Sequence, residues 1–311
     1  MKKALINGIV VVLASIFIGG SIVPGISGIV ANTSNVSIIN TDDFDSEIEE
    51  IMKKGHMPSL VACIIKDNIT AWSKGYGYYD YYNKKKTTVN IVYPIASITK
   101  SVTATAIMQI IENESYDIEL DDNVSEYLPF ELKNPKYPEV NITYRMLLAH
   151  QSSLSDTTIR FIFLFMILKI PFNLNTYRHY LVEGGLFYNS KVWNEYRPGE
   201  GVCYTIQGTD ILRLLIEQIT NQSYTDYCQE HIFEPLKMYN TSFYFSDYDK
   251  EQLAHLYIWM AGFYFKCPYI QPNTYTGGAL KTTMSDFSHF LIMHTSRAFS
   301  KFVSVIMHNI L

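Results

Sequence analysis

Hydrophobic and polar positions divide the chain into a short apolar N-terminal run and a longer amphipathic body. Two lysines precede about 20 mostly apolar residues, 4–23, and the small residues Gly25 and Ser27 follow. This order of charged, apolar and small-residue regions is typical of a secretory signal, and the run is also long enough to span a bilayer. We therefore expect residues 1–28 to be a signal peptide or a retained membrane anchor.

Helical and alternating periods then predict the first elements of the body. Residues 29–43 are polar and short-sided, and we expect them to be a linker. Apolar residues recur at helical spacing over 44–54, which predicts a short amphipathic helix. Two β-rich runs, 60–65 and 69–73, flank the polar residues 66–68, and this pattern predicts a β-hairpin.

From residue 97 to about 240 the helical period dominates, interrupted by loops rich in Pro, Asn and Gly. Strands followed by a long helical stretch predict an α+β fold, in which an antiparallel sheet is flanked by helices and carries an inserted all-helical subdomain. Two aromatic-rich apolar runs, 161–172 and 256–265, are too short to span a bilayer. We expect both to pack in the core or a lid; the alternatives are a membrane surface for either run and a substrate groove for the second.

Composition limits the classes of function. Of 311 residues, 48% are apolar and 18% are charged, so the chain can bury a sizeable core and is not disordered as a whole. The formal net charge of −5 argues against a nucleic-acid partner, which usually meets a basic patch. The histidines and the four cysteines lack the spacings of metal sites, so we expect no metal and no other cofactor. The cysteines allow three disulfide pairings, and buried thiols are the alternative.

One short motif carries candidate chemistry: Ser97 and Lys100, at the start of an apolar helix rich in small residues. Side chains three residues apart share one face of a helix, so the hydroxyl and the amine are expected to meet. A serine in the first helical turn also lies at the positive end of the helix dipole. An amine packed in an apolar site can accept the serine proton near neutral pH, which activates the hydroxyl as a nucleophile.

Five stretches in order extend this motif over about residues 45–311. They are the hairpin region 58–80, IASITKSVTATAIMQIIE around Ser97, the region ending in ITYRMLLAHQSSLSD, YRPGEGVCYTIQGTDILRLLIEQIT, and TGGALKTTMSDFSHFL. Together they resemble the serine β-lactamase-like superfamily, nearest to its branch of class C β-lactamases, D-alanyl-D-alanine carboxypeptidases and esterases. The resemblance implies one β-lactamase-like domain over 44–311.

Residue by residue, the resemblance implies roles for four side chains. Ser97 is implied as the acylated nucleophile and Lys100 as its proton acceptor. Tyr204 matches the tyrosine of the family's Y-x-N motif, a phenol that relays a proton to the leaving group. His150 matches a family histidine, and its expected role is to hold a loop by hydrogen bonds. We expect the terminal atoms of the first three to lie within about 3–4 Å, with Ser97 opening a helix and Tyr204 on a loop leading into a helix at Asp210.

Two departures from the family pattern favour an impaired protein. Ile206 stands where the Y-x-N motif has asparagine, and isoleucine cannot hydrogen-bond the lysine amine or a substrate amide. Gln207 is adjacent but is expected to point elsewhere. The family's third motif, K-T-G or H-x-G, is expected on a strand beyond Gly277 and Gly278, and the sequence ends at Leu311 without it. We therefore expect a C-terminally incomplete domain.

The leading hypothesis is an exported serine hydrolase that forms an acyl-enzyme with an amide or ester, as carboxypeptidases, β-lactamases and esterases do. Its partner is a small-molecule or peptide substrate, and its location is extracellular or anchored by residues 4–23 at the outer face of the cytoplasmic membrane. The first alternative is an impaired or dead relative that binds peptide or cell-envelope ligands, or an inactive fragment. A second alternative is a scaffold at a membrane surface.

Overall fold

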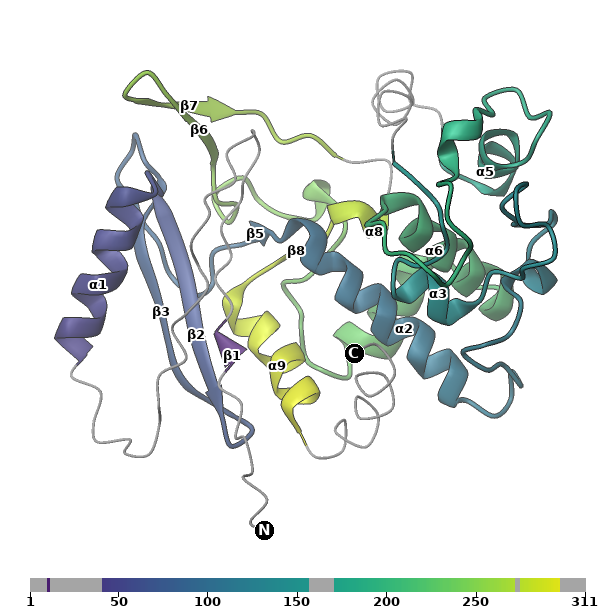
Figure 1. The fold of residues 1–311 in the computed structure, drawn as a ribbon. Helices are drawn as coiled ribbons and strands as arrows, with labels where there is room; N and C mark the ends of the chain where they lie inside the picture. Colours follow the sequence, from purple (N-terminus) through teal and green to yellow (C-terminus); the bar gives the residue numbers. More distant parts are fainter. Residues whose placement is uncertain (1–9, 12–40, 157–170, 272–274, 297–311) are drawn as a thin grey trace, which may run out of the picture. The chain divides into compact units, whose positions relative to one another are not determined.

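A computed structural model describes residues 10–11, 41–156, 171–271 and 275–296, which form an α+β structure (Figure 1). The described residues divide into two compact units. The first comprises the described residues up to Tyr93 together with 248–269 and 283–296. The second comprises the described residues between Pro94 and Asp247 and between Ile270 and Thr282.

The first unit contains the main antiparallel sheet and its covering helices. Its elements are β1 (Val10–Val11), α1 (Thr41–Lys54), β2 (Ser59–Lys66), β3 (Ile69–Asp80), β4 (Lys85–Lys86), β6 (Leu256–Met260), β7 (Phe263–Cys267) and α9 (Met284–Thr295). The sheet has the order β1-β2-β3-β4, and neighbouring strands run antiparallel. The predicted antiparallel sheet flanked by helices is therefore confirmed.

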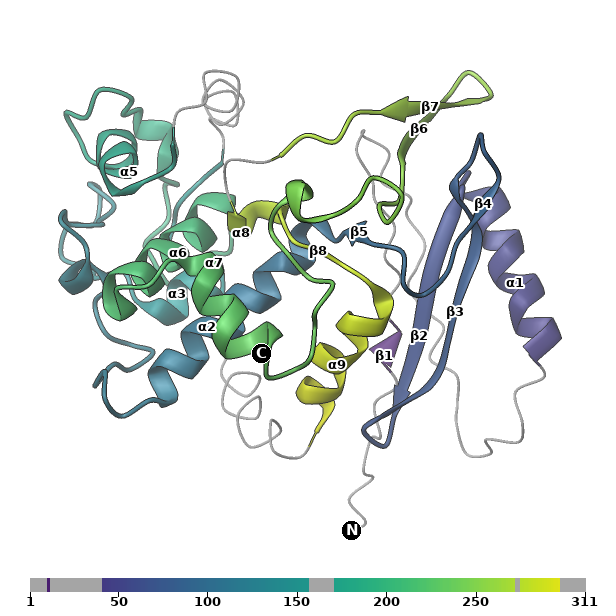
Figure 2. The ribbon, with the colours of Figure 1, turned by 180° about the vertical axis from the view of Figure 1, so that it is seen from behind.

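The two faces of β2 are covered by different helices. Leu60 and Ala62 pack against Ile48 and Met52 of α1, while α9 contacts β2 and β3 from the opposite face (Figures 1 and 2). Four consecutive residues of β2, from Leu60 on, are buried for this reason. A strand buried on both faces reads as a continuous apolar run, which is the pattern the sequence has here.

The turn between β2 and β3 confirms the predicted hairpin. Asp67 and Asn68 form it with φ of +52° and +61°. A two-residue hairpin turn of type I′ needs positive φ at both positions, and Asn and Asp tolerate that conformation better than most other residues with side chains. The strands continue beyond the predicted 60–65 and 69–73, to Lys66 and Asp80.

Gly77 is the position in β3 that a side chain would disturb most clearly. Its φ is +68°, and an added Cβ would lie 2.3 Å from the carbonyl oxygen of Pro58. We expect Gly77→Ala to lower the free energy of unfolding by about 2–4 kcal/mol, through backbone strain and overpacking together. The matched control is Gly262→Ala, because Gly262 has φ +87° but nothing within 4 Å of an added Cβ; the expected loss is about 1 kcal/mol. Equal losses in urea denaturation of the two variants would contradict this account.

The second unit is mainly helical, as predicted for the inserted subdomain. Its helices are α2 (Thr99–Glu112), α3 (Tyr144–Leu148), α5 (Leu174–Leu181), α6 (Ile206–Thr220), α7 (Tyr224–Cys228) and α8 (Tyr275–Gly278). Short helical turns occur at Ala96–Ile98, Val124–Tyr127, Ser190–Val192, Gln229–Phe233 and Phe245–Asp247. Strand β5 (Tyr93–Pro94), where the chain passes from the first unit to the second, pairs with β8 (Lys281–Thr282). Helix α6 is buried over most of its length and contacts α2, α3 and α8.

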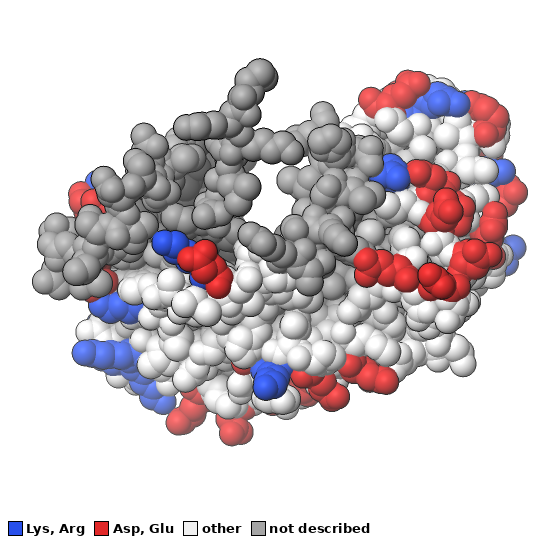
Figure 3. Space-filling model, turned by 90° about the horizontal axis from the view of Figure 1, so that it is seen from below, with Lys and Arg blue, Asp and Glu red and all other residues white. Residues whose placement is uncertain are grey.

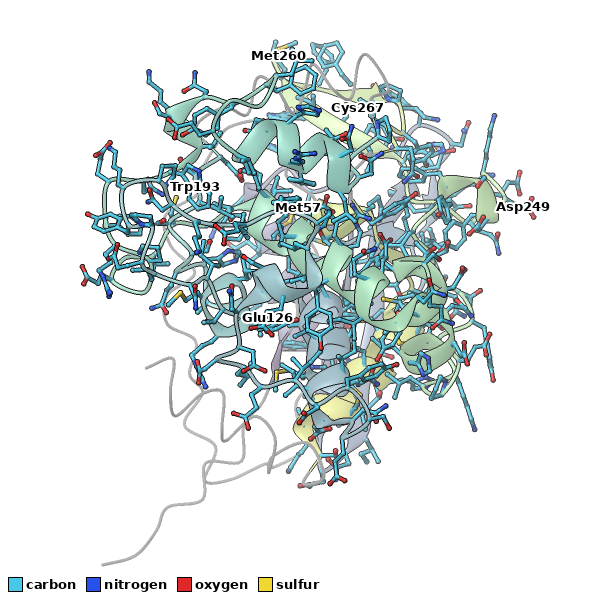
Figure 4. All side chains as sticks on the ribbon, turned by 90° about the vertical axis from the view of Figure 1, so that its right-hand side faces the viewer. Met57, Glu126, Trp193, Asp249, Met260 and Cys267 are labelled. Atoms are coloured by element: carbon cyan, nitrogen blue, oxygen red, sulfur yellow. The ribbon has the colours of Figure 1, made fainter. Side chains whose placement is uncertain are left out.

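Two segments differ from the sequence predictions. Helix α1 begins at Thr41, inside the predicted linker 29–43, because the polar and acidic residues there are compatible with a first helical turn. The run 256–265 is not a buried packing segment but the hairpin β6–β7, in which Met260 and Phe263 are 59% and 68% exposed. Met260 lies at the periphery of the side chains in Figure 4. The pairing Met260↔Phe263 and Ile258↔Phe265 gathers apolar side chains on one face, while Trp259 and Tyr264 pair on the other.

Several predictions fall outside the described residues. They concern most of the predicted signal peptide or anchor 1–28, residues 161–170 of the first aromatic-rich run, and the residues after Ser296, which bear on the family's third motif. Within the described part of the chain, no helix has the length and hydrophobicity needed to cross a membrane. All four cysteines are described, and all are free thiols.

Candidate active site

Ser97 lies in the helical turn Ala96–Ile98, directly before α2, and its side chain is exposed. The preceding residue, Ala96, has φ +45°, a left-handed conformation that costs a residue with a side chain about 1 kcal/mol or more. Thr99 holds this strained residue, since its hydroxyl donates to the Ala96 carbonyl at 2.6 Å. The same hydroxyl accepts from the backbone N–H of Leu280 at 3.2 Å. The turn that presents Ser97 is therefore fixed by side-chain and backbone contacts.

Lys100 follows one helical turn later and reaches back to Ser97. Its Nζ lies 3.5 Å from Ser97 Oγ, and it also donates to the carbonyl oxygen of Gly277 at 3.2 Å. The predicted meeting of hydroxyl and amine on one helix face is therefore present. The Gly277 contact comes from α8, 177 residues further along the chain, and the sequence pattern gave no sign of it.

Tyr204 contacts the amine of Lys100 through the face of its ring. Lys100 Nζ is 4.9 Å from the ring centroid, and the Tyr204 side chain is 53% exposed. The expected separation of 3–4 Å between terminal atoms is thus met by Ser97 and Lys100, whereas Tyr204 makes a cation–π contact.

The helix after Tyr204 begins at Ile206, four residues earlier than the predicted start at Asp210. The reason is the cap: the Thr205 hydroxyl accepts from the N–H of Gly208 at 3.2 Å, which starts the helix directly after it. Tyr204 is therefore the last residue before the cap rather than part of a longer loop.

His150 forms hydrogen bonds with the residues on either side of Tyr204, in agreement with its expected role of holding a loop. Its carbonyl accepts from the N–H of Cys203 at 2.9 Å, and its Nδ1 accepts from the N–H of Thr205 at 3.4 Å. Its ring lies 4.7 Å from the ring of Tyr204. Burial, with a smaller contribution from the charge of Lys100, lowers the pKa of His150. The neutral ring that results is the form that can accept through Nδ1.

Asp156 is a site residue to which the sequence analysis assigned no role. One carboxylate oxygen accepts from the N–H of Ile206 at 2.7 Å, and the other is buried without a hydrogen-bond partner among the described residues. Burial raises the pKa of Asp156, while the backbone N–H groups of Ile206 and Gln207 and the charge of Lys100 act in the opposite direction. Asp156 is the last residue of ITYRMLLAHQSSLSD, one of the five stretches that resemble the family, and this place is the sequence feature that marks it as a candidate.

Ile206 and Gln207 do not supply the amide of the Y-x-N motif. Ile206 offers Asp156 its backbone N–H, and its side chain has no hydrogen-bonding atom. Gln207 is buried, and its amide nitrogen donates to the hydroxyl of Tyr180 at 2.9 Å. The expectation that Gln207 points away from the motif's position agrees with this contact.

Gly278 lets α8 approach the serine turn. A Cβ added to Gly278 would lie 3.2 Å from the Cα and carbonyl carbon of Ala96. That contact is tighter than ordinary van der Waals packing, so the absence of a side chain permits the close approach of the two backbones. The approach places the neighbouring Gly277 carbonyl within reach of Lys100.

The amino-acid sequence that forms this site matches a known protein family. The family model described as Beta-lactamase matches residues 44–303, most of the chain. The chain belongs to the beta-lactamase family. Membership in the beta-lactamase family confirms the resemblance inferred from the five ordered stretches, and it supports a serine-hydrolase type of function.

Individual proteins that are similar to this chain share about a third of its residues or fewer. "Protein flp" of Staphylococcus aureus strain MW2 is 31% identical over 211 residues, which is 68% of this chain and 40% of that protein. The octameric penicillin-binding protein homologue from Pyrococcus abyssi superposes with a TM-score of 0.69 at 26% identity, over 82% of this chain and 56% of that one. A class C beta-lactamase superposes with a TM-score of 0.61 at 20% identity, over 81% of this chain and 63% of that one, and shows the fold alone. The chain thus spans about 40% of the length of the curated relative named here.

The site holds no cluster of metal ligands. Among the residues that the structure describes, no group of three or more His, Cys, Asp or Glu side chains could bind a metal ion.

Proposed function

We propose that this protein is a serine hydrolase that cleaves an amide or ester through an acyl-enzyme on Ser97. The observation that carries the proposal is the pair of contacts at Lys100 Nζ, with Ser97 Oγ at 3.5 Å and the Gly277 carbonyl at 3.2 Å. A neutral amine has two N–H bonds and one lone pair. If one N–H donates to Gly277, the lone pair can turn toward the Ser97 hydroxyl and accept its proton.

In the acylation step, the Lys100 amine takes the Ser97 proton as Oγ attacks the substrate carbonyl carbon. The resulting tetrahedral intermediate collapses by breaking the bond to the leaving group. The leaving group receives the proton held by Lys100, relayed through the hydroxyl of Tyr204; because the ring makes the present contact, the proposal requires this hydroxyl to turn toward the amine when substrate binds. Water then attacks the acyl-enzyme, gives a proton to the amine, and releases the acid while Ser97 regains its proton.

The substrate class we propose is a small molecule or peptide with an amide or ester bond. On the face seen in Figure 3, the visible described residues include both basic and acidic side chains, and the acidic ones gather toward the right of the view. Together with a net charge of −5, this distribution favours a small substrate over nucleic acid. The proposal keeps the exported location that residues 1–28 predict.

A second candidate function is binding without turnover, and Ile206 is the observation that favours it. The family's Y-x-N amide would bond the lysine amine or the substrate, and isoleucine can do neither. A protein of this kind would bind peptide or cell-envelope ligands noncovalently or stop at a slow acylation step.

Pre-steady-state hydrolysis of a chromogenic ester tests the proposal. A hydrolase that acts through an acyl-enzyme releases chromophore in a burst that approaches one equivalent per chain when deacylation is the slower step. A steady release at the rate of buffer alone would instead favour the binding function.

Tyr204→Phe is expected to lower the burst rate by about 10²-fold, because the phenol that relays the proton is lost. The variant keeps the ring over Lys100, so its fold and the cation–π contact are preserved. Tyr239→Phe is the matched control, since Tyr239 is also exposed and has no place in the site. An unchanged burst in Tyr204→Phe would show that the proton takes another route.

A further inference from the structure

A buried carboxylate lies beneath the site and has no part in the mechanism above. Asp210 of α6 is fully buried, with 0% exposure. One of its oxygens accepts from the hydroxyl of Tyr177 at 2.9 Å, and the other accepts from the hydroxyl of Thr276 at 3.1 Å. Arg213, one turn later, donates to the Thr276-bound oxygen from Nε at 2.9 Å. Each carboxylate oxygen therefore has at least one defined donor.

Arg213 makes this cluster rigid. It is itself buried, and besides Asp210 it donates to Glu217 at 2.8 Å and to the carbonyl of Phe172. Desolvation opposes the charge, but the carboxylates of Asp210 and Glu217 outweigh it and raise the pKa of Arg213. A buried ion pair with its hydrogen bonds satisfied tolerates little displacement, because moving either charge leaves it unpaired.

The cluster is linked to the site through α8. Thr276 is fully buried, and its neighbour Gly277 offers the carbonyl that accepts from Lys100 Nζ at 3.2 Å. We propose that Asp210 acts as a positioning residue for Lys100, by holding Thr276 and thereby the Gly277 carbonyl in place. This inference rests on the proposed function, in which Lys100 is the base.

The position of this carbonyl controls the direction of the lysine lone pair. A side chain with four rotatable bonds has no fixed direction of its own, so the Gly277 carbonyl selects the orientation that aims at Ser97. A misplacement of about 1 Å in such a contact can cost about 10²-fold in rate. The two glycines of α8 have no side chains, and Tyr275 contacts Arg213 and Phe243 through its ring. The Thr276 hydroxyl makes the direct hydrogen bond from α8 to Asp210.

The other polar groups around Lys100 come from different elements. Ser97 belongs to the turn before α2, and Tyr204 to the segment before α6. The charge of Lys100 also affects the pKa values of His150 and Asp156. None of these four side chains is bonded to Thr276 in the described structure, so a substitution at Thr276 tests the α8 route by itself.

Thr276→Val is the test, because valine keeps the shape of threonine and removes the hydroxyl. Thr276→Ser is the matched control, because serine keeps the hydroxyl. We expect the rate of Ser97 acylation by a chromogenic ester to fall by about 10²-fold in Thr276→Val and to stay near the wild-type rate in Thr276→Ser. Noncovalent affinity for the ester, measured on Ser97→Ala backgrounds, should be the same in both. Thermal unfolding of both variants checks that the fold is intact.

Crystal structures of the same proteins separate this inference from the proposed function. In Thr276→Val we expect the Gly277 carbonyl to leave Lys100 Nζ, whereas in wild type and Thr276→Ser it should remain in hydrogen-bond contact. If wild type acylates, an unmoved carbonyl or an unchanged rate in Thr276→Val overturns the inference. If wild type does not acylate, the proposed function fails, and the position of the carbonyl alone decides whether Asp210 holds α8.

Discussion

Replacing Ser97 by alanine is expected to abolish the ester burst and to lower single-turnover chromophore release by about 10⁴-fold or more. The substitution removes the hydroxyl oxygen that lies 3.5 Å from the amine of Lys100. Lys100→Met, which keeps length and removes the base, is expected to lower the rate by about 10³-fold. Since the two groups act on one proton transfer, the double variant should be no slower than Ser97→Ala alone.

Ser101→Ala is the matched control for this prediction. Ser101 lies on the same helix, but its hydroxyl donates to the carbonyl of Ile98 at 2.7 Å and takes no part in the site. Its loss should leave the burst unchanged. If Ser97→Ala kept a wild-type burst, the nucleophile would have to be another residue, and the account of the site would be wrong.

Replacing Asp210 by alanine is expected to lower the free energy of unfolding by about 3–5 kcal/mol, the largest stability effect we predict for this protein. The variant leaves the buried guanidinium of Arg213 without its main counter-charge. It also leaves the buried hydroxyls of Tyr177 and Thr276 without their acceptor. Urea denaturation followed by circular dichroism measures the loss.

The control for Asp210→Ala is an ion pair at the surface. Asp121 accepts two hydrogen bonds from Arg145, at 2.8 and 2.9 Å, but its side chain is 67% exposed. Asp121→Ala should cost about 1 kcal/mol or less, because water solvates the guanidinium that is left. A loss at Asp210 as small as that at Asp121 would contradict the claim that burial makes the Asp210–Arg213 pair costly to break.

Local patterns in the sequence predict those parts of the structure whose causes are local. The hairpin followed from two β-rich runs around Asp67 and Asn68, residues that tolerate the positive φ of a tight turn. The contact between Ser97 and Lys100 followed from their spacing on one helix. In both cases the residues that determine the geometry lie within a few positions of each other.

The remaining features depend on contacts between distant segments. The Gly277 carbonyl reaches Lys100 from 177 residues away, and the carboxylate of Asp156 meets α6 across 50 residues. A backbone carbonyl has no sequence signature of its own, and the place of Asp156 at the end of ITYRMLLAHQSSLSD does not show which segment its carboxylate contacts. The hairpin β6–β7 was expected to be packed because its residues form an apolar run. The sequence does not show that alternate residues of the two strands gather on one exposed face.

The most direct test of the central claim is the mass of the protein after reaction with an activated ester. Wild type and Ser97→Ala are mixed with the ester, quenched in acid during the burst, and analysed as intact chains and as peptides. We predict one acyl group per wild-type chain, on the peptide that contains Ser97, and none on Ser97→Ala. A folded wild-type chain that carries no acyl group, or carries it on a residue other than Ser97, would contradict the account.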